Sequence, residues 1–450
     1  MVLGGALRLG AARGDLWLDE IWSLQLAHAA PTALDVIWGL HFDNNDYLNT
    51  LWMRLWGDDG SALVQRALSV AAGVGLVALG AAFPLERGRL AAAVTAFLLA
   101  GSRFLVHYGS EARGYGPALF CALAAYLALE RHLATRERRW AGGFAASALL
   151  GLLSHLTFVF VLAGAAAWVA ADAWRSRRAS ALDLALLALP VAFLGFLWLV
   201  DVRWLAVGGA PHYDPLAVLP DLAGATLGLP EGALRWLGLG FVAAAGYELW
   251  ALARARDLRA VFFAGAFLAP IPYLLVLRPE YVYPRHFAVL VPLFLYVAGS
   301  GWARIAGLGR AGLAAATLAL AVFAAGNALQ LAALLKDGRG HYREAVELIL
   351  ASSPPGPITV GSFHDFRNRT VLEDQTRRLG VRDRIRYVET RQVGEHPPQW
   401  LVLHDFRLEP PRKDYIEVLG HVYALVRIFP YAGLSGWTWL VYREIPQPPQ

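Results

Sequence analysis

The sequence is poor in charge and in cysteine. Charged residues make up 17% of the 450 residues and hydrophobic residues 57%, with a mean hydropathy of +0.44. This balance excludes an ordinary soluble enzyme and is typical of a protein with many membrane-spanning helices. The one cysteine, Cys121, lies inside an apolar run, so the sequence offers neither a disulfide framework nor a cysteine metal site.

The sequence also lacks the short motifs of nucleotide and hydrolase chemistry. It contains no Walker A loop, no dinucleotide-binding glycine pattern, no HExxH zinc motif and no GxSxG elbow. The formal net charge of +5 would suit a nucleic acid, but the basic residues fall in short clusters between apolar runs rather than along one face. We therefore expect no nucleic-acid partner and favour a donor substrate that already resides in the membrane.

Apolar segments long enough, or nearly so, to cross about 30 Å of hydrocarbon fill most of the first 335 residues. They are 61–85, 90–106, 112–130, 140–153, 156–174, 181–200, 233–253, 260–277, 286–303 and 311–335. We expect residues Met1 to Gly10 to be the stump of one more crossing that starts upstream of this sequence. The fold class predicted is a polytopic α-helical membrane protein with about 11 transmembrane helices.

Two classes of loop alternate between these segments, which sets the topology. Short arginine-rich loops at 86–89, 131–139, 175–178, 254–259 and 304–310 are expected on the cytoplasmic side by the positive-inside rule. The loops at 19–56, 107–115, 154–155, 201–232 and 278–285 then face outward together with the C-terminal region. The strong excess of Arg over the lysines, Lys336 and Lys413, suggests a bacterial genome, hence a bacterial inner membrane and a periplasmic outer side.

From residue 336 onward the pattern changes to that of a soluble domain. Helix-like stretches at 342–351 and 367–379 alternate with strand-like stretches at 357–361, 384–389, 400–403, 418–428 and 437–443. This alternation predicts a small periplasmic α/β domain over residues 336–450, following a transmembrane domain over residues 1–335.

The first outer loop, residues 15–60, carries the most distinctive polar residues. Asp19 and Glu20 lie among tryptophans and leucines at the expected membrane surface. A carboxylate there can act as a general base on an acceptor hydroxyl. The alternative is that Asp19 caps a helix over residues 21–29. A second polar cluster on the same loop comprises Asp43, Asn44, Asn45 and Asp46.

The loop at residues 107–115 is denser in functional groups than a helix connection requires. Tyr108 and Tyr115 flank Glu111, a candidate second acid or metal ligand, and Arg113, a candidate phosphate ligand. The alternative is an interfacial aromatic belt with an ion pair between Glu111 and Arg113.

Further candidates lie where other outer loops enter the membrane. Arg285 and His286 directly precede an apolar segment, which suits a lipid-linked phosphate at headgroup depth. Arg285 could instead extend toward the headgroups without binding a substrate. Arg66, about a turn inside its segment, is a weaker candidate, as is His155 at another outer turn.

The tetrapeptide His-Asp-Phe-Arg occurs twice in the soluble domain, at 364–367 and 404–407, each time after an expected strand. The carboxyl ends of strands are common ligand sites in α/β layers. An aspartate that caps a turn after a strand explains the repeat more simply.

Several blocks of the sequence, in order, resemble one family. LRLGAARGDLWLDEIWSL, DNNDYLNTLWMRLWG, RALSVAAGVGLVALG, HYGSEARGYGPALFCALAAYLAL and YVYPRHFAVLVPLFLYVAG look like successive blocks of the GT-C glycosyltransferases. More narrowly, they resemble the protein O-mannosyltransferase and aminoarabinose-transferase-like superfamily, called glycosyltransferase family 39-like in bacteria. The resemblance extends over roughly residues 5 to 300.

The resemblance implies a polyprenyl-phosphate sugar donor, transfer on the periplasmic face and inversion at the anomeric carbon. It assigns Asp19 as the base with Glu20 beside it, matches Glu111 and Arg113 to a block after the third crossing, and matches Arg285 to an Arg that faces the lipid phosphate. Many relatives carry His-Pro-Pro where this chain has Asn45-Asp46-Tyr47, a departure that bears on the acceptor and on any metal role of that His.

The function expected is therefore transfer of a hexosyl or pentosyl group from a polyprenyl-phosphate donor to an envelope glycan, lipid or protein. No soluble cofactor is required, and a divalent metal ion is left open. Two alternatives are an oligosaccharide ligase or polymerase that uses a lipid diphosphate, and a membrane transporter. Few charges in mid-membrane and no obvious internal repeat argue against transport.

Overall fold

The computed structural model describes residues 1–57, 60–85, 88–177, 180–208, 214–230, 236–277 and 282–445. The expected loops at 86–89, 175–178, 201–232 and 278–285 therefore fall partly outside the described residues. The chain divides into two compact units. The helical unit comprises Met1–Ala12 and Leu26–Leu331, and the sheet unit comprises Arg13–Gln25 and Ala332–Gln450.

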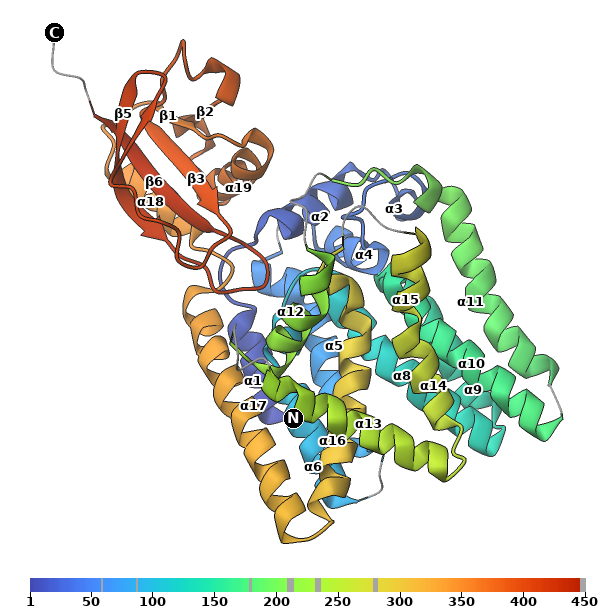
Figure 1. Cartoon of the computed structure of the whole chain (residues 1–450). Helices are drawn as coiled ribbons and strands as arrows, with labels where there is room; N and C mark the ends of the chain where they lie inside the picture. The colour runs from blue at the N-terminus through green and yellow to red at the C-terminus, as the bar shows by residue number, and fades with distance from the viewer. Residues whose placement is uncertain are drawn as a thin grey trace. The chain divides into compact units, whose positions relative to one another are not determined.

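Within the described residues, seven helices are long and apolar enough to cross a membrane. They are built from α5 (Ala62–Ala82), α8 (Tyr115–Thr135), η1 with α10 (Leu156–Phe158 and Val159–Ser176), α11 with η2 (Ala181–Val200 and Val202–Trp204), α14 with α15 and η4 (Arg259–Leu268, Pro270–Pro272 and Tyr273–Leu277), η5 with α16 (Pro284–Leu290 and Val291–Ala306), and α17 (Arg310–Asp337). Figure 1 labels them along the chain. The polytopic helical architecture is thus confirmed.

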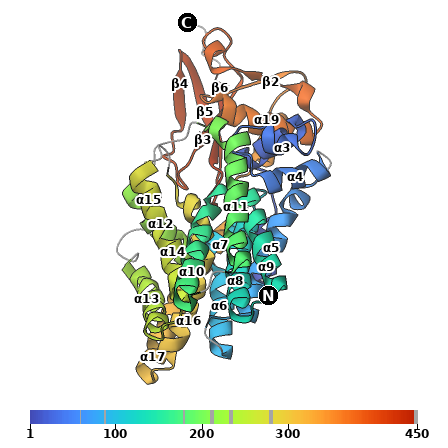
Figure 2. The same ribbon diagram turned by 90° about the vertical axis from the view of Figure 1, so that its right-hand side faces the viewer.

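Shorter helices complete the helical unit. They are α1 (Val2–Ala11), α3 (Asp35–Trp38), α4 (Tyr47–Trp56), α6 (Arg89–Gly101), α7 (Arg103–Tyr108), α9 (Arg138–Ser154), α12 (Pro215–Leu227) and α13 (Gly238–Arg254), while α2 (Leu18–Ala29) begins in the sheet unit. Helices α8, α9, α10 and α11 lie side by side (Figure 2). Helix α12 was not expected, because its short apolar run lies inside a presumed outer loop.

One expected helix is broken. The segment 90–106 was predicted as a single crossing, but the structure divides it into α6 and α7 at Ser102, whose backbone is extended. Two long-range hydrogen bonds hold the break: Ser102 Oγ donates to the carbonyl of Thr226 at 2.8 Å, and the Arg103 N–H donates to Asn327 Oδ1 at 2.6 Å. A side chain of α17 therefore satisfies the Arg103 N–H, which has no intrahelical partner at the break, and the Ser102 hydroxyl joins the break to α12.

Ion pairs at the helix ends hold together the side that bears the arginine-rich loops. Each pair joins different helices, as expected for charges excluded from the hydrocarbon. They are Arg259 with Glu130 at 3.1 Å, Arg304 with Glu248 at 2.7 Å, and His132 with Asp183 at 2.9 Å.

The sheet unit is a mixed α/β layer. Its six strands, β1 (Ile358–Gly361), β2 (Ile385–Val388), β3 (Trp400–Asp405), β4 (Tyr415–Val418), β5 (His421–Phe429) and β6 (Thr438–Ile445), lie in the order β2-β1-β3-β6-β5-β4. Strands β2, β1 and β3 are parallel, and the remaining pairings are antiparallel. Helix α19 (Asp365–Arg378) lies to one side of the strands (Figure 2), and α18 (Tyr342–Ala351) contacts β6.

Most of the strands and helices expected from the sequence after residue 336 are confirmed. The exception is the stretch 418–428, which was predicted as one strand and is instead the hairpin of β4 and β5. Leu419 and Gly420 form its tight turn with φ values of 51° and 86°. This left-handed backbone is the conformation that two-residue hairpin turns require, and Leu at the first position concealed it.

The segment Arg13–Gln25 packs on the C-terminal residues as part of the sheet unit. Trp17 contacts Trp437 edge to face with ring centroids 6.4 Å apart, and Trp22 contacts Phe366 in the same way at 5.4 Å. The carboxylate of Asp15 also accepts a hydrogen bond from the Arg343 N–H at 2.8 Å. The stretch that carries Asp19 is therefore supported by residues more than 300 positions away in the sequence.

Candidate active site

The loop between α7 and α8 is buried in the helical unit. The side chains of Tyr108, Glu111 and Arg113 are 3%, 1% and 5% exposed, so this loop is not a surface connection. Glu111 lies 3.5 Å from Nε2 of His107, one turn earlier. The loop carbonyls are also held: Asn49 Nδ2 donates to Ala112 at 2.7 Å and Ser69 Oγ donates to Arg113 at 3.1 Å. The loop is thus rigidly placed by α4 and α5.

Asp46 pairs with Arg113, so the first outer loop and the 107–115 loop are in contact. Its Oδ2 accepts from Arg113 Nε at 2.8 Å and from the Gly114 N–H at 3.0 Å. Asp46 is 7% exposed. Removing one partner of such a buried pair typically costs about 3 to 5 kcal/mol, because the remaining charge is left unpaired. Arg113 thus forms an ion pair with Asp46, a partner that the sequence did not suggest.

Gly114 leaves no room for a side chain in this arrangement. A Cβ there would lie 1.8 Å from the Ser154 carbonyl oxygen and 2.9 Å from Asp46 Cβ. We expect Gly114→Ala to force Asp46 away from Arg113 and to destabilise the protein by about 1 to 3 kcal/mol, as overpacking does. The thermal midpoint of the purified membrane protein measures this change. Gly142→Ala on α9 is the control, because nothing lies within 4 Å of its Cβ position; equal midpoints for the two variants would contradict the prediction.

Aromatic rings extend from the loop toward the turn after α9. The Tyr108 and Tyr115 rings are 4.7 Å apart, and the Tyr115 and His155 rings are also 4.7 Å apart. His155 Nδ1 accepts hydrogen bonds from the Thr157 hydroxyl at 2.8 Å and the Thr157 N–H at 3.3 Å. Burial lowers the pKa of His155 to about 4, so the ring is neutral at pH 7 and carries its proton on Nε2.

Arg285 belongs to the same cluster. Its guanidinium lies over the Tyr283 ring, 5.0 Å from the centroid, and its charge acts on Tyr108, Tyr115 and His155. The side chain is partly exposed, in contrast to Arg113. His286 follows, with its ring 5.6 Å from that of Tyr283. Two guanidinium groups, one buried and one accessible, thus share this end of the helical unit.

A small polar pocket of about 70 Å³ lies beside the cluster. Asp43, Asp46, Tyr47, His155 and Asp201 contribute to its lining. Asp201 is 1% exposed; it accepts from the Tyr47 hydroxyl and lies 2.7 Å from His41 Nδ1. Burial and the Asp201 carboxylate raise the pKa of Tyr47, so its phenol stays protonated.

Sequence reasoning missed this Asp201 network. The available signal was Asp201 itself, which directly follows the twenty-residue helix α11. The one charged residue of that helix is Asp183, in its first turn. A carboxylate that ends an apolar helix is costly to bury and therefore indicates a local partner.

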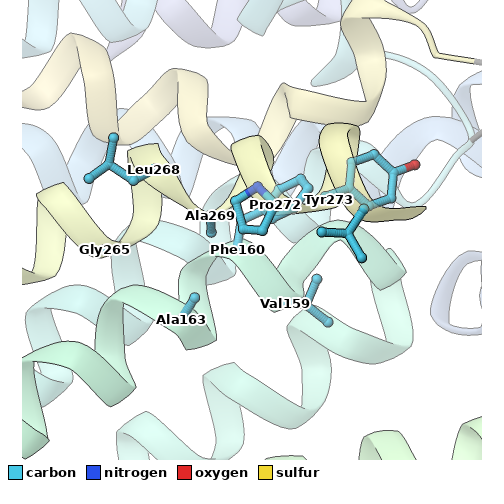
Figure 3. Close-up of a pocket in the computed structure, with 9 residues that line it drawn as sticks. Val159, Phe160, Ala163, Gly265, Leu268, Ala269, Pro272 and Tyr273 are labelled. Atoms are coloured by element: carbon cyan, nitrogen blue, oxygen red, sulfur yellow. The ribbon is translucent and has the colours of Figure 1, made fainter. Parts of the chain in front are cut away.

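An apolar groove of about 690 Å³ runs between α10 and the α14–α15 segment. Its lining residues are Val159, Phe160, Ala163, Gly265, Leu268, Ala269, Pro272, Tyr273 and Val276, and Figure 3 shows Phe160, Pro272 and Tyr273 gathered together. Phe160 stacks on Phe287 with centroids 6.0 Å apart. Phe287 is two residues after Arg285 in the sequence, so one wall residue of the groove contacts the segment that carries Arg285.

Asp19 and Glu20 lie in the sheet unit, on the first turn of α2. Glu20 is fully buried, and its Oε2 accepts from the Trp17 N–H at 3.2 Å. That contact is the glutamate half of a capping box, with Glu20 at the third helical position. Asp19 is partly exposed. The capping role that was considered for Asp19 is therefore filled at least in part by Glu20.

The remaining candidates are placed as follows. Arg66 is fully buried, and its Nη1 donates to the carbonyl of Ala12 at 3.0 Å. Asn44 is buried, whereas Asp43 is exposed at the pocket rim. Within the described part of the chain, no group of three or more His, Cys, Asp or Glu side chains is arranged to hold a metal ion. The metal that the sequence left open has no ligand set among these residues.

Comparison with known proteins gives a fold but no sequence family. No family model matches the chain, and no curated protein matches it. The structure of ArnT from Cupriavidus metallidurans in the apo state matches 99% of this chain and 97% of its own at a TM-score of 0.55 and 12% identity. The chain has the GT-C fold. ArnT bound to undecaprenyl phosphate matches 100% of this chain and 98% of its own, with the same TM-score and 13% identity. The fold expected from the sequence blocks is confirmed.

Proposed function

We propose that this protein is a membrane glycosyltransferase that takes a sugar from a polyprenyl phosphate. The observation that carries the proposal is the apolar groove, one wall residue of which, Phe160, stacks on Phe287 in the segment that carries Arg285. A polyprenyl phosphate has a long apolar tail and an anionic head, and the groove and the cluster offer one site for each. That ArnT, which shares the fold, has been solved with undecaprenyl phosphate supports this choice of donor.

Arg285 is the proposed ligand of the donor phosphate. Arg113 is occupied by Asp46 in a buried pair, whereas Arg285 is partly exposed. Its guanidinium would neutralise the negative charge that grows on the leaving phosphate oxygen as the bond to the sugar breaks. Arg113, neutralised by Asp46, holds the 107–115 loop in place, and Glu111 lies 3.5 Å from His107 Nε2 in the same loop. His286 and Arg66 support this region without a direct contact to phosphate in the proposal.

Asp19 is the proposed general base. It would remove the proton from an acceptor hydroxyl while that oxygen attacks the anomeric carbon. The new carbon–oxygen bond forms as the bond between the anomeric carbon and the phosphate oxygen breaks, so the anomeric configuration inverts. Glu20 is fully buried and engaged with the Trp17 N–H, which makes it a positioning residue for this turn rather than the base.

The polar pocket is the proposed place for the transferred sugar. His155 presents an Nε2–H donor, Tyr47 and Asp201 add a hydroxyl and a carboxylate, and Asp43 lies at the rim. Tyr108 and Tyr115 provide ring faces nearby. We place the reaction on the periplasmic face of a bacterial inner membrane, with an envelope glycan, lipid or protein as acceptor.

Filling the groove should weaken donor binding. Ala163→Phe adds a ring to the groove wall, and we expect the KM for the polyprenyl-phosphate donor to rise about tenfold, which is about 1.4 kcal/mol of lost tail contact. The kcat should change much less, because the tail takes no part in the chemical step. Ala166→Phe on the exposed side of the same helix is the control. An equal KM in the two variants would move the tail to another surface.

The proposal is tested by comparing donors. Membranes that contain the protein are given radiolabelled hexoses and pentoses on polyprenyl monophosphate or polyprenyl diphosphate, and transfer to endogenous acceptor is counted. Transfer from a monophosphate donor is the expected result. Transfer from diphosphate donors alone would favour the ligase or polymerase, and solute movement into vesicles by an Asp19-substituted protein would favour the transporter.

A further inference from the structure

The two His-Asp-Phe-Arg copies come together in space. The first copy follows β1 and the second overlaps the end of β3, and these strands are parallel neighbours. The His364 and His404 rings are consequently 5.5 Å apart and edge to face. A repeat of four residues in the sequence thus becomes a single cluster at the carboxyl edge of the parallel strands.

The aspartates of the two copies have structural roles. Asp365 accepts from the Tyr387 hydroxyl at 2.8 Å and the Thr390 N–H at 3.0 Å, which holds the segment after β2. Asp405 accepts from the Arg407 N–H, two residues on, at 2.8 Å. The turn-capping explanation of the repeat therefore accounts for the aspartates. His364 also has a capping role, because its Nδ1 accepts from the Arg367 N–H at 3.4 Å at the start of α19. These roles do not account for His404, the phenylalanines or the Arg367 side chain.

The two ring nitrogens of His404 each face a hydrogen-bond donor, Asn368 on one side and Arg367 on the other. Asn368 is oriented by Trp439, whose indole N–H donates to Asn368 Oδ1 at 2.8 Å, so the Asn368 amide nitrogen faces His404 Nδ1 at 3.0 Å. Nδ1 must accept that bond, which leaves the proton of the neutral ring on Nε2. Nε2 lies 3.3 Å from Arg367 Nη1, which is also a donor. An oxygen atom bound between these two donors would accept from both.

Exposed aromatic rings surround these donors. Phe363, Phe366 and Phe406 are 50%, 49% and 45% exposed. The ring centroid of Phe406 lies 5.3 Å from that of His404 and 6.0 Å from that of Trp437. The guanidinium of Arg367 lies over the Phe406 ring, 5.1 Å from its centroid. Such a group of exposed rings around a few convergent polar atoms is typical of a ligand surface rather than of a monomer's ordinary exterior.

We propose that this cluster, His364, His404, Arg367, Phe363, Phe366 and Phe406, binds a sugar unit of the acceptor. A sugar combines apolar C–H faces, which pack on aromatic rings, with oxygen atoms that accept hydrogen bonds, and the cluster offers both partners. The acceptor is therefore a saccharide or carries one. That the bound sugar belongs to an acceptor rests on the proposed function, but sugar binding itself does not require glycosyl transfer.

The position of the cluster gives it a role beside the base. Phe366 contacts Trp22 at 5.4 Å, and Trp22 is one helical turn after Asp19 on α2. Both groups belong to the sheet unit. A glycan held on the cluster would thus be bound by the same unit that carries the proposed base, with a neighbouring hydroxyl available for deprotonation.

Saccharide binding can be measured without donor by saturation-transfer NMR on the full-length protein in lipid nanodiscs, which avoids the sugar headgroup of maltoside detergents. The probes are methyl glucoside, a neutral sugar, and glucosamine 1-phosphate, an anionic one. Comparing them shows whether His404 and Arg367 prefer a hydroxyl oxygen or a phosphate oxygen. We expect saturable transfer to at least one probe and a loss of about tenfold or more in Phe406→Ala and in Arg367→Met, which keeps the aliphatic stem. Tyr415→Ala removes another exposed ring of the sheet unit, on β4, and should bind as wild type.

Three outcomes would overturn the proposal. They are the absence of an NMR saturation-transfer signal from either sugar, undiminished binding in both cluster variants, and complete competition by inorganic phosphate, which would make the cluster an anion site only. The thermal midpoint checks that each variant is folded, and Phe406→Ala changes only a surface ring. Binding that persists in Asp19→Asn, together with an absence of sugar transfer by wild type, would refute the proposed function while leaving the sugar site intact.

Discussion

Replacing Asp19 with Asn is expected to lower the kcat of sugar transfer by about 10² to 10⁴-fold, the usual contribution of a positioned general base. Asparagine keeps the size of the side chain but cannot take a proton. Helix α2 should be retained, because the contact of Glu20 with the Trp17 N–H at its start is unchanged. The measurement is initial transfer rate at saturating donor, with the amount of folded protein determined by size-exclusion chromatography.

Asp15→Asn provides the matched control for this variant. Asp15 is a partly exposed carboxylate of the same segment, and its role is to accept from the Arg343 N–H. Transfer should change little, because asparagine can still accept that bond. Full activity of Asp19→Asn would return Asp19 to a structural role and direct the search for the base to Glu111.

Replacing Arg285 with Ala is expected to lower kcat by about 10² to 10³-fold, the effect of removing one preorganised group that stabilises developing charge. Arg285→Lys should recover part of the loss, since an ammonium supplies the charge but not the bidentate geometry. Transfer rates over a range of donor concentrations separate this loss in kcat from a loss in donor affinity.

Arg203→Ala controls for the removal of an arginine that lies over an aromatic neighbour. Arg203 covers the Trp204 ring at 4.6 Å, much as Arg285 covers Tyr283 at 5.0 Å. We expect near wild-type transfer from Arg203→Ala. Equal losses in the two variants would show that the effect belongs to interfacial anchoring and not to the donor phosphate.

Local patterns in the sequence predicted much of the fold. The apolar runs and arginine clusters predicted the helices, and helix α18 was expected at its observed bounds. The patterns failed where distant partners decide the outcome. The break at Ser102 depends on Thr226 and Asn327, which no local window contains. Likewise, the Leu419–Gly420 turn carries only one of the two residues that usually signal a hairpin.

The sequence predicted which outer loops share one side of the protein, but it did not predict which of their residues pair. The structure brings Asp46, Arg113, Tyr108, Tyr115 and Arg285 together, all from outer loops that the topology had placed on one side. The pairing of Arg113 with Asp46 could not be predicted, because Asp46 is 67 positions away and Glu111 is nearer in sequence. The groove and the Asp201 network are properties of packed helices, and no motif marks them.

The measurement that tests the central claim most directly is ³¹P NMR of the purified protein in nanodiscs that contain a polyprenyl-phosphate sugar and an acceptor glycan. The account predicts that the sugar phosphodiester signal disappears, that free polyprenyl phosphate appears in equal amount, and that the product has the inverted anomeric configuration. A phosphodiester that stays intact with every monophosphate sugar tried, while a diphosphate donor is consumed, would contradict it.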